Sequence, residues 1–347
     1  MTTRGPSSVP RRALLSAALL AVGGTATTVL FEHSRHERHP AHKPPDGVYR
    51  KLVVGWAAAE HCPVYVAAAQ KGFFDHYNLD IDIAPATNDG HDTLEALQHR
   101  EFDYAVAPAL TWLPYLHAGL AAHLVMGVQP GYFRLLVRRS SGITRLDQLM
   151  DRNVAMPDMN AADKLFFAIM MRRKGLDALT RINWVDLPFT EIADSARAQR
   201  IDAVVAHDPY AWLLLQTAPD LFVELASSNT GHYAERTSLV LGVADSALQA
   251  DPDAATSLVL ALNTAARWAN THRDDAATLI AGSMPELSPA SARAMLHNAP
   301  AIHPVLGQSL RDQIAQYCDE LQLVGLLPDA ENTTLLAQSY TRNVLRE

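Results

Sequence analysis

The chain has 347 residues and a mass of 37.9 kDa, which is enough for one to three domains of ordinary size. Hydrophobic residues make up 48% and charged residues 19%, and this apolar content excludes intrinsic disorder because it suffices to form a core. The formal net charge of -8 argues against a nucleic-acid-binding protein, which ordinarily carries a basic surface.

The charge is unevenly distributed along the chain. Residues 1–50 carry seven basic and three acidic side chains, a net +4, so the rest of the chain carries -12. The sequence is therefore a basic leader followed by an acidic body. A body of that sign weakly repels an anion at long range, which keeps neutral and partly cationic solutes among the candidate ligands.

The first 31 residues are predicted to be an export signal. Arg11 and Arg12 directly precede an uncharged apolar run at residues 13–31, and paired arginines before such a run indicate the twin-arginine route. The run is also long enough to span a bilayer as a helix, so an uncleaved amino-terminal anchor is the alternative. Both versions predict a protein of the periplasm or the cell exterior.

Residues 32–50 are predicted to be a linker, because they contain three prolines, one glycine and few apolar side chains. Histidines recur every third residue from His33 to His42, and such a tract can bind metal weakly. A polar spacer is the simpler interpretation, so no metal site is predicted.

The two cysteines, Cys62 and Cys318, are too few for a disulfide framework or a Cys-rich zinc site. Nothing in the sequence places the two thiols together, and their pairing is left open. Cys62 falls at a predicted helix start, where a thiol can have a lowered pKa. No partner base accompanies it, so no catalytic residue is predicted.

From residue 51 short strands alternate with helices. Apolar or alternating runs predict strands at residues 51–56, 79–84, 104–107, 122–127, 133–138, 153–156, 182–187, 203–206, 221–225 and 238–243. Helical periodicity predicts helices at residues 63–70, 91–99, 111–118, 161–174, 191–199 and 211–216, with a short helical turn at 145–150. From about residue 252 only helices are predicted, at residues 254–271, 273–282, 289–297 and 308–324.

This alternation is typical of an open, largely parallel α/β sheet, which binds ligands beyond the carboxyl ends of its strands. The first strand is not followed by Gly-x-Gly-x-x-Gly, and the sequence contains no phosphate-binding Gly-Lys-Ser/Thr loop. Neither nucleotide-binding motif is therefore present.

An ordered series of short motifs resembles one family of solute-binding proteins. The segments that carry the resemblance are 71–74 (KGFF), 78–81 (NLDI), 96–98 (ALQ), 102–105 (FDYA), 141–143 (SGI), 146–149 (LDQL), 154–157 (VAMP), 202–204 (DAV) and 208–211 (DPYA). Together they resemble the nitrate, sulfonate and taurine type of ABC-transporter substrate-binding proteins, which includes binders of thiamine pyrimidine precursors. The resemblance covers roughly residues 51–325.

The resemblance implies the type II periplasmic binding protein fold, an α/β fold with two lobes. Two open mixed sheets would flank a central cleft and be joined by a two-strand hinge. It implies a first lobe of residues 51–133 plus 239–347 and a second lobe of residues 134–238. The hinge region is expected at Phe133–Arg138 and Ser238–Val243.

Loops that follow the strands hold the candidate ligand contacts, because helix amino termini there expose N–H groups that hold anions. The candidates are Glu60, His61, Cys62, Asn88, Asp89, Ala109, Thr111, Asp158, Met159, Asn160, Phe189, His207, Asp208 and Tyr210. Several of these have a simpler structural role open to them, such as capping a helix. Relatives often place Gly or Ser where this chain has residues 158–160, which argues against a simple nitrate or sulfonate ligand. The mixture of carboxylates and histidines suits an amino-pyrimidine as well as an anion.

The resemblance implies a non-enzymatic solute-binding component of an ABC import system. It would capture a sulfonate, nitrate, another oxoanion or a related organic compound between its lobes by hinge closure. The expected partners are that solute, the permease transmembrane subunits and their ATPase, with no nucleic acid, cofactor or metal, and we expect a monomer.

Three alternatives stay open: a binder of a thiamine-precursor pyrimidine, an enzyme on the same fold, and an anchored sensor domain. Pyrimidine synthases that resemble these binders carry a cysteine-rich segment, which two cysteines cannot supply. An export signal also fits poorly with cytosolic biosynthesis.

Overall fold

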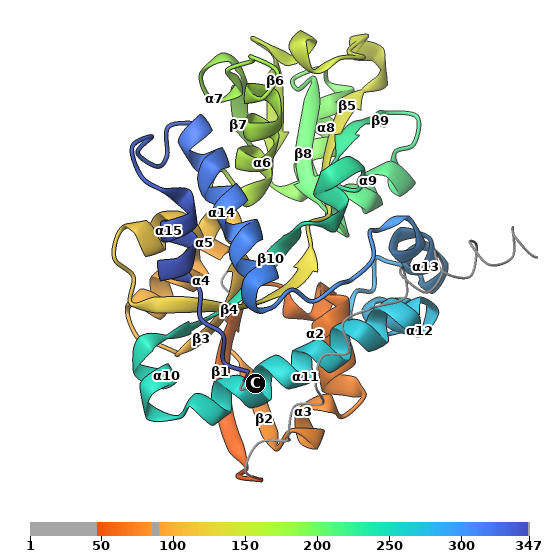
Figure 1. The fold of residues 1–347 in the computed structure, drawn as a ribbon. Coiled ribbons are helices and arrows are strands. Elements are labelled where there is room, and N and C mark those ends of the chain that lie inside the picture. The colour runs from red at the N-terminus through yellow and green to blue at the C-terminus, as the bar shows by residue number, and fades with distance from the viewer. Residues whose placement is uncertain (1–46, 85–89, 346–347) are drawn as a thin grey trace, which may run out of the picture. The chain divides into compact units, whose positions relative to one another are not determined.

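The computed structural model describes residues 47–84 and 90–345 (Figure 1). The predicted signal, the histidine tract and the candidate contacts Asn88 and Asp89 lie outside these residues. Among the helices in the described ranges, none combines the length and apolar character needed to cross a membrane.

Five strands form the first sheet, in the order β2-β1-β3-β10-β4. They are β1 (Arg50–Trp56), β2 (Leu79–Ile83), β3 (Tyr104–Pro108), β4 (Ala122–Pro130) and β10 (Thr237–Ala244). β1 pairs in parallel with β2 and β3, whereas β10 pairs antiparallel with β3 and β4. β10 therefore returns from far along the chain to an inner position of this sheet.

Five further strands form the second sheet, in the order β7-β6-β8-β5-β9. They are β5 (Phe133–Arg138), β6 (Asn153–Met156), β7 (Asn183–Asp186), β8 (Ala203–His207) and β9 (Phe222–Ser227). β6 pairs in parallel with β7 and β8, and β5 pairs antiparallel with β8 and β9. Two mixed sheets are thus confirmed. Within each sheet four strands run in one direction, and only β10 in the first sheet and β5 in the second run opposite, so the largely parallel character that alternation predicted is also confirmed. The two exceptions are the strands that arrive from the other sheet, which need no helical crossover to their neighbours.

Every predicted strand is present, and so are the predicted helices. The longer helices are α2 (Pro63–Gln70), α4 (Gly90–Gln98), α5 (Ala109–His117), α6 (Ala162–Arg172), α8 (Phe189–Arg197), α9 (Tyr210–Thr217), α11 (Pro252–Thr271), α12 (Arg273–Ser283), α13 (Pro289–Asn298) and α14 (Gly307–Leu323). The sequence missed α3 (Phe73–His76), α7 (Ala178–Arg181), α10 (Asp245–Ala250) and α15 (Thr333–Tyr340). These have one or two turns, too few for a helical period to stand out.

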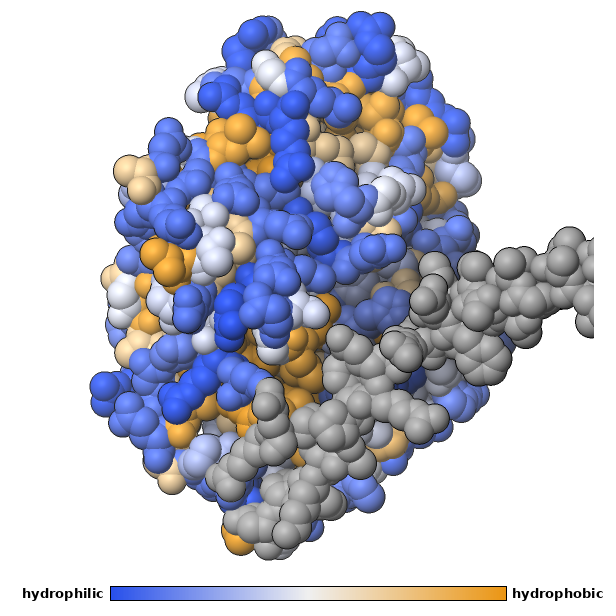
Figure 2. Space-filling model, in the orientation of Figure 1, coloured by the Kyte–Doolittle hydropathy of each residue, from blue (hydrophilic) through white to orange (hydrophobic). Residues whose placement is uncertain are grey.

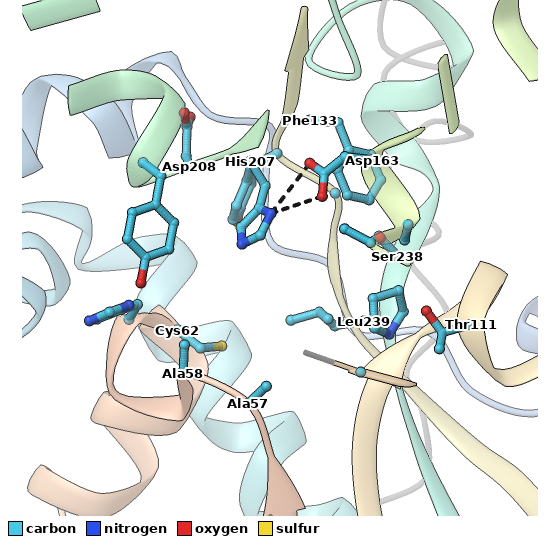
Figure 3. A pocket seen from close by; sticks show the side chains of 18 of the residues that line it. Ala57, Ala58, Cys62, Thr111, Phe133, Asp163, His207, Asp208, Ser238 and Leu239 are labelled. Atoms are coloured by element: carbon cyan, nitrogen blue, oxygen red, sulfur yellow. Dashed lines mark hydrogen bonds and ion pairs between the residues drawn. The ribbon is translucent and has the colours of Figure 1, made fainter. Parts of the chain in front are cut away.

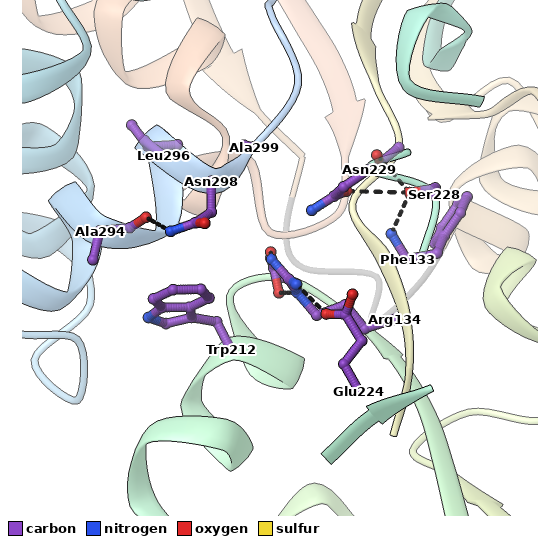
Figure 4. Close-up of polar contacts among 12 residues, drawn as sticks. Phe133, Arg134, Trp212, Glu224, Ser228, Asn229, Ala294, Leu296, Asn298 and Ala299 are labelled. Carbon is purple, nitrogen blue, oxygen red and sulfur yellow. Dashed lines mark hydrogen bonds and ion pairs between the residues drawn. The ribbon is translucent and has the colours of Figure 1, made fainter. Parts of the chain in front are cut away.

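The chain passes between the two sheets twice. The first crossing, Gly131–Tyr132, joins β4 to β5, and the second, residues 228–236, joins β9 to β10. The buried Ser228 side chain links the crossings, since its hydroxyl accepts from the Phe133 N–H at 2.9 Å and donates to the Gly131 carbonyl at 2.8 Å (Figure 4). The two ranges expected to form the hinge lie within β5 and β10, and the crossings directly precede them.

Buried apolar side chains fill the space between sheets and helices, while the face in Figure 2 is largely hydrophilic with apolar residues in several separate groups. Trp112 on α5 is fully buried, and its indole N–H donates to the Val240 carbonyl at 2.9 Å. Its ring packs on Gly242 of β10, where a Cβ atom would lie 2.4 Å from the ring. Trp112 is therefore a core residue that requires a glycine opposite it.

We expect Gly242→Ala to lower the free energy of unfolding by about 1–3 kcal/mol, because the added methyl overpacks a rigid aromatic neighbour. Denaturant titration measures the change. Gly282→Ala is the matched control, since a Cβ atom at that helical position meets nothing within 4 Å and alanine favours the helix. Equal stabilities for both variants would contradict the packing described for Trp112.

Candidate functional site

A cavity of about 400 Å³ lies between the two sheets, a volume typical of small-molecule sites. The starts of six helices, namely α2, α4, α5, α6, α8 and α9, contribute to its wall together with the carboxyl ends of β1, β3, β4 and β8. Each helix start exposes backbone N–H groups with a partial positive charge. The arrangement therefore presents hydrogen-bond donors to a solute from both sheets.

Nine of the predicted contacts line this cavity. They are His61, Cys62, Thr111, Asp158, Asn160, Phe189, His207, Asp208 and Tyr210. Glu60, Ala109 and Met159 do not line it. Ala109 is buried in the hydrophobic core. Met159 packs against the same core, because neighbouring residues of a turn cannot all face the same way. Glu60 is exposed to solvent near His61.

Other residues of the wall were not predicted. They are Trp56, Ala57, Ala58, Gly90, Val106, Pro108, Gln129, Pro130, Gly131, Tyr132, Phe133, Pro157, Ala161, Ala162, Asp163, Pro209, Ser238 and Leu239. Sequence reasoning considered only loops that follow strands, whereas residues 129–133 and 238–239 belong to strands and to a crossing. A signal existed for Asp163, since the first turn of a helix whose preceding loop was predicted to bind ligand also faces the site.

Two aromatic side chains in the wall carry polar hydrogens without a partner in the described ranges. The Trp56 Nε1–H and the Tyr132 hydroxyl are buried, with 5% and 9% of each residue exposed. His61 Nδ1 is likewise buried and unpaired. A buried donor without a partner costs about 1–3 kcal/mol. The two polar atoms are themselves covered by protein, but both residues line the cavity, so a small side-chain shift would present each donor to an acceptor atom of a ligand.

His207 and Asp163 form an ion pair in the wall, with Nδ1 and Oδ2 3.0 Å apart (Figure 3). The Asp163 side chain is 5% exposed, whereas 45% of the His207 side chain stays open. Burial alone lowers the pKa of His207, but Asp163, with help from Asp208 and Asp158, raises the pKa above its ordinary 6.5. Asp163 therefore favours the protonated, positively charged form of the His207 imidazole, which lines the cavity.

Asp208 is engaged by Arg134 rather than left open to a ligand. Arg134 donates from Nε and Nη2 to the two Asp208 carboxylate oxygens, each at 2.7 Å, and from Nη1 to Glu224 (Figure 4). Burial disfavours the guanidinium, but both carboxylates outweigh it and raise the pKa of Arg134. The carboxylate that the sequence predicted as a ligand contact is thus occupied by an internal ion pair.

Cys62 caps α2 and is buried, and its thiol donates to Gln129 Oε1 at 3.0 Å. Burial raises the pKa of Cys62 to about 12, so the low-pKa thiol considered from the sequence is wrong. Backbone N–H groups of α2 lower this pKa by less than burial raises it. Cys62 and Cys318 are both free and buried.

Tyr210 brings the two sides of the cavity into contact. Its ring lies edge-on to His61, with centroids 5.8 Å apart, and also packs against Phe189 at 5.2 Å and His207 at 5.8 Å. His61 precedes α2 of the first sheet, whereas Tyr210 begins α9 beyond β8 of the second. Aromatic rings from both halves therefore enclose the cavity.

Within residues 47–84 and 90–345 no group of three or more His, Cys, Asp or Glu side chains is placed to hold a metal ion. The described wall also contains no Lys or Arg. Positive charge at the cavity comes from the helix starts and from His207.

Comparison with known proteins points to one family and one fold. The model of the family described as NMT1/THI5 like matches residues 58–276. No curated protein matches the chain by sequence.

Several solved structures share the fold, all at low sequence identity. The alkanesulfonate-binding protein SsuA from Xanthomonas axonopodis pv. citri, bound to MOPS, has a TM-score of 0.68 at 20% identity, covering 83% of this chain and 98% of that one. The aliphatic sulphonate binding protein SsuA from Escherichia coli has a TM-score of 0.68 at 18% identity, and the match covers 86% of this chain and 94% of that one. The nitrate-binding protein NrtA from Synechocystis PCC 6803 has a TM-score of 0.68 at 12% identity, and the match covers 86% of this chain and 87% of that one. These likenesses show that the chain has the periplasmic binding protein fold.

We expect Asp208→Ala to lower the free energy of unfolding by about 3–5 kcal/mol, because it leaves the buried Arg134 guanidinium without its bidentate partner. Denaturant titration measures this loss. Asp194→Ala breaks an exposed pair with Arg197 and should change stability by no more than about 0.5 kcal/mol. A loss at Asp208 as small as the loss at Asp194 would contradict the buried ion pair.

The His207–Asp163 pair predicts a pH-dependent contribution to stability. Because the folded pKa of His207 is raised, its stabilisation is complete below the unfolded value of 6.5 and is lost as pH rises through the folded pKa. Thermal melts of the wild type and His207→Gln from about pH 5 to about pH 8 measure it. The stability difference should be largest at the acid end, and a difference that grows with pH would overturn this assignment.

Proposed function

Because the chain belongs to the NMT1/THI5-like family, we propose that it is the extracytoplasmic solute-binding component of an ABC import system. Its first lobe comprises residues 51–133 plus 239–347 and its second lobe residues 134–238. The solute binds in the cavity between the sheets, and the lobes close on it by bending at the two crossings that Ser228 links.

The observation that carries this proposal is a cavity walled by six helix starts, with the unpaired donors of Trp56 and Tyr132 just behind its surface. Such a wall recognises acceptor atoms, and oxoanions such as a sulfonate or nitrate offer several of them. The solute is therefore a sulfonate, nitrate, another oxoanion or a related organic compound. The cationic side chain on the cavity side is His207, which Asp163 keeps protonated, since Arg134 does not line the cavity.

A thiamine-precursor pyrimidine is the second candidate ligand. Rings of Trp56, Tyr132, Phe133, Phe189 and Tyr210 line the cavity, and flat aromatic walls suit a planar heterocycle. The mixture of donors with carboxylates in the same wall also suits a ring that bears both kinds of group.

The leader exports the protein to the periplasm or the cell exterior, by the twin-arginine route or as an uncleaved anchor. There the protein acts as a monomer and passes its solute to the permease transmembrane subunits, which their ATPase drives. Its role is binding rather than catalysis, and Cys62 in particular is no nucleophile, because its thiol has a pKa of about 12 and bonds to an amide oxygen rather than to a base.

A thermal-shift screen of the purified protein with MOPS, nitrate, bicarbonate and an amino-pyrimidine tests the function. A solute at 100 times its dissociation constant should stabilise the protein by about 2.7 kcal/mol. Turnover of any of these compounds, with no shift of the melting point by any of them, would refute the binding-protein assignment.

The site is tested with Trp56→Phe and Tyr132→Phe, each of which removes one donor while keeping a ring. Titration calorimetry with the solute found in the screen should show affinity reduced about 5- to 10-fold for each variant. Trp184→Phe is the control, because its indole N–H bonds to the Ala178 carbonyl outside the cavity. Wild-type affinity in both donor variants would remove Trp56 and Tyr132 from the site.

A further inference from the structure

Helix α9 lies in the second lobe by chain order but packs into the core of the first. It follows β8 and precedes β9, both strands of the second sheet. Trp212 and Leu213 are nevertheless buried in a hydrophobic cluster whose other buried members are all first-lobe residues. Leu214, the next residue, is buried in the second-lobe core. The start of α9 is therefore a point where the two lobes touch.

One hydrogen bond fixes this contact. The Trp212 Nε1–H donates to the hydroxyl of Ser291 on α13 at 2.9 Å, and Trp212 is only 9% exposed. α9 and α13 lie near each other in Figure 1. Separation of the lobes at this point would break the hydrogen bond and expose the indole ring to water.

The same indole ring is linked to the cavity wall. The Arg134 guanidinium carbon lies 5.4 Å from the Trp212 ring centroid, within range of a cation–π contact (Figure 4). Arg134 in turn binds both oxygens of Asp208, which lines the cavity. Tyr210, at the start of the same helix, meets His61 across the cavity. A continuous set of contacts thus runs from the cavity wall through Arg134 and Trp212 to Ser291.

Elsewhere the lobes are joined by a separate contact. α14 packs against α5 and β4 of the first lobe and against α6 of the second. There Glu320, which is buried, pairs with Arg173, directly after α6, at 2.7 Å and with Arg236 of the second crossing at 2.7 Å. This contact includes a crossing, so it accompanies the hinge, whereas the contact between α9 and α13 includes none.

We propose that the Trp212–Ser291 hydrogen bond is a latch that favours the closed arrangement of the lobes, and that Arg134 and Trp212 are positioning residues that couple it to the cavity wall. The latch deepens the proposed solute-binding function, because it sets how readily a captured solute is released. Neither residue of the hydrogen bond needs to touch the solute for this effect.

The test measures the separation of α9 from α12, the helix that packs against α13, in the full chain without any solute. Spin labels are placed on cysteines introduced at the exposed Gln216 of α9 and Asp275 of α12, while the buried Cys62 and Cys318 stay unlabelled. Double electron–electron resonance then reports the distribution of label distances. In the wild type we expect a population at the short distance that the α9–α13 contact imposes.

Ser291→Ala removes the acceptor and should reduce the ratio of short to long distances about five-fold, the effect of one hydrogen bond. Ser288→Ala is the matched control. The Ser288 hydroxyl caps the same helix by accepting from the Ser291 N–H at 3.2 Å, so this variant removes a cap of α13 and leaves the hydroxyl that accepts from Trp212 in place. Trp212→Phe is the second variant, and it should act like Ser291→Ala with no further effect when the two are combined.

A wild-type distribution without the short distance, or the same distribution in Ser291→Ala as in the wild type, would overturn the latch. An effect of Ser288→Ala as large as that of Ser291→Ala would overturn it as well, since the cause would then be the stability of α13. The measurement needs no solute, so failure of the solute screen and failure of the latch are separate results.

Discussion

The buried ion pair between Arg134 and Asp208 is the interaction on which the site depends most. Arg134 stands at the start of β5, directly after the first crossing, and Asp208 stands at the end of β8, where the cavity begins. Two hydrogen bonds of 2.7 Å fix these positions relative to each other. Removing a carboxylate partner would leave the buried guanidinium charge uncompensated and would lower the stability of the fold. The pair therefore holds the first crossing, the cavity wall and the start of α9 in fixed positions relative to one another.

The electrostatics of the cavity differ from those of the whole body. The acidic body repels an incoming anion weakly and at long range, whereas helix starts act within a few ångströms. In the described wall the carboxylates of Asp163 and Asp208 are paired inside the protein, Asp163 with His207 and Asp208 with Arg134. Their negative charge is thereby compensated locally, so the helix starts set the electrostatic character of the wall.

Much of the fold could be predicted because its signals are local. All strands and the longer helices follow from periodicity within about ten residues, and the ordered motifs supplied the two-lobed arrangement. Part of the site was also predictable, since ligands bind where strands end: His61, Asp158 and His207 line the cavity as expected. Trp56, Tyr132 and Ser238 escaped prediction because they lie in strands and at a crossing, and only the approach of the two sheets turns them toward a common space.

The sequence by itself determined the alternation of strands and helices, the acidic balance of the body and the helix starts that follow the strands. These properties depend on residues close together in the chain. Only the tertiary structure decided that Asp163 meets His207, that Arg134 occupies Asp208 and that burial raises the pKa of Cys62 to about 12. The physical reason is that pairing and desolvation act through space, between residues 44 and 74 positions apart in the two ion pairs, where no sequence period reaches.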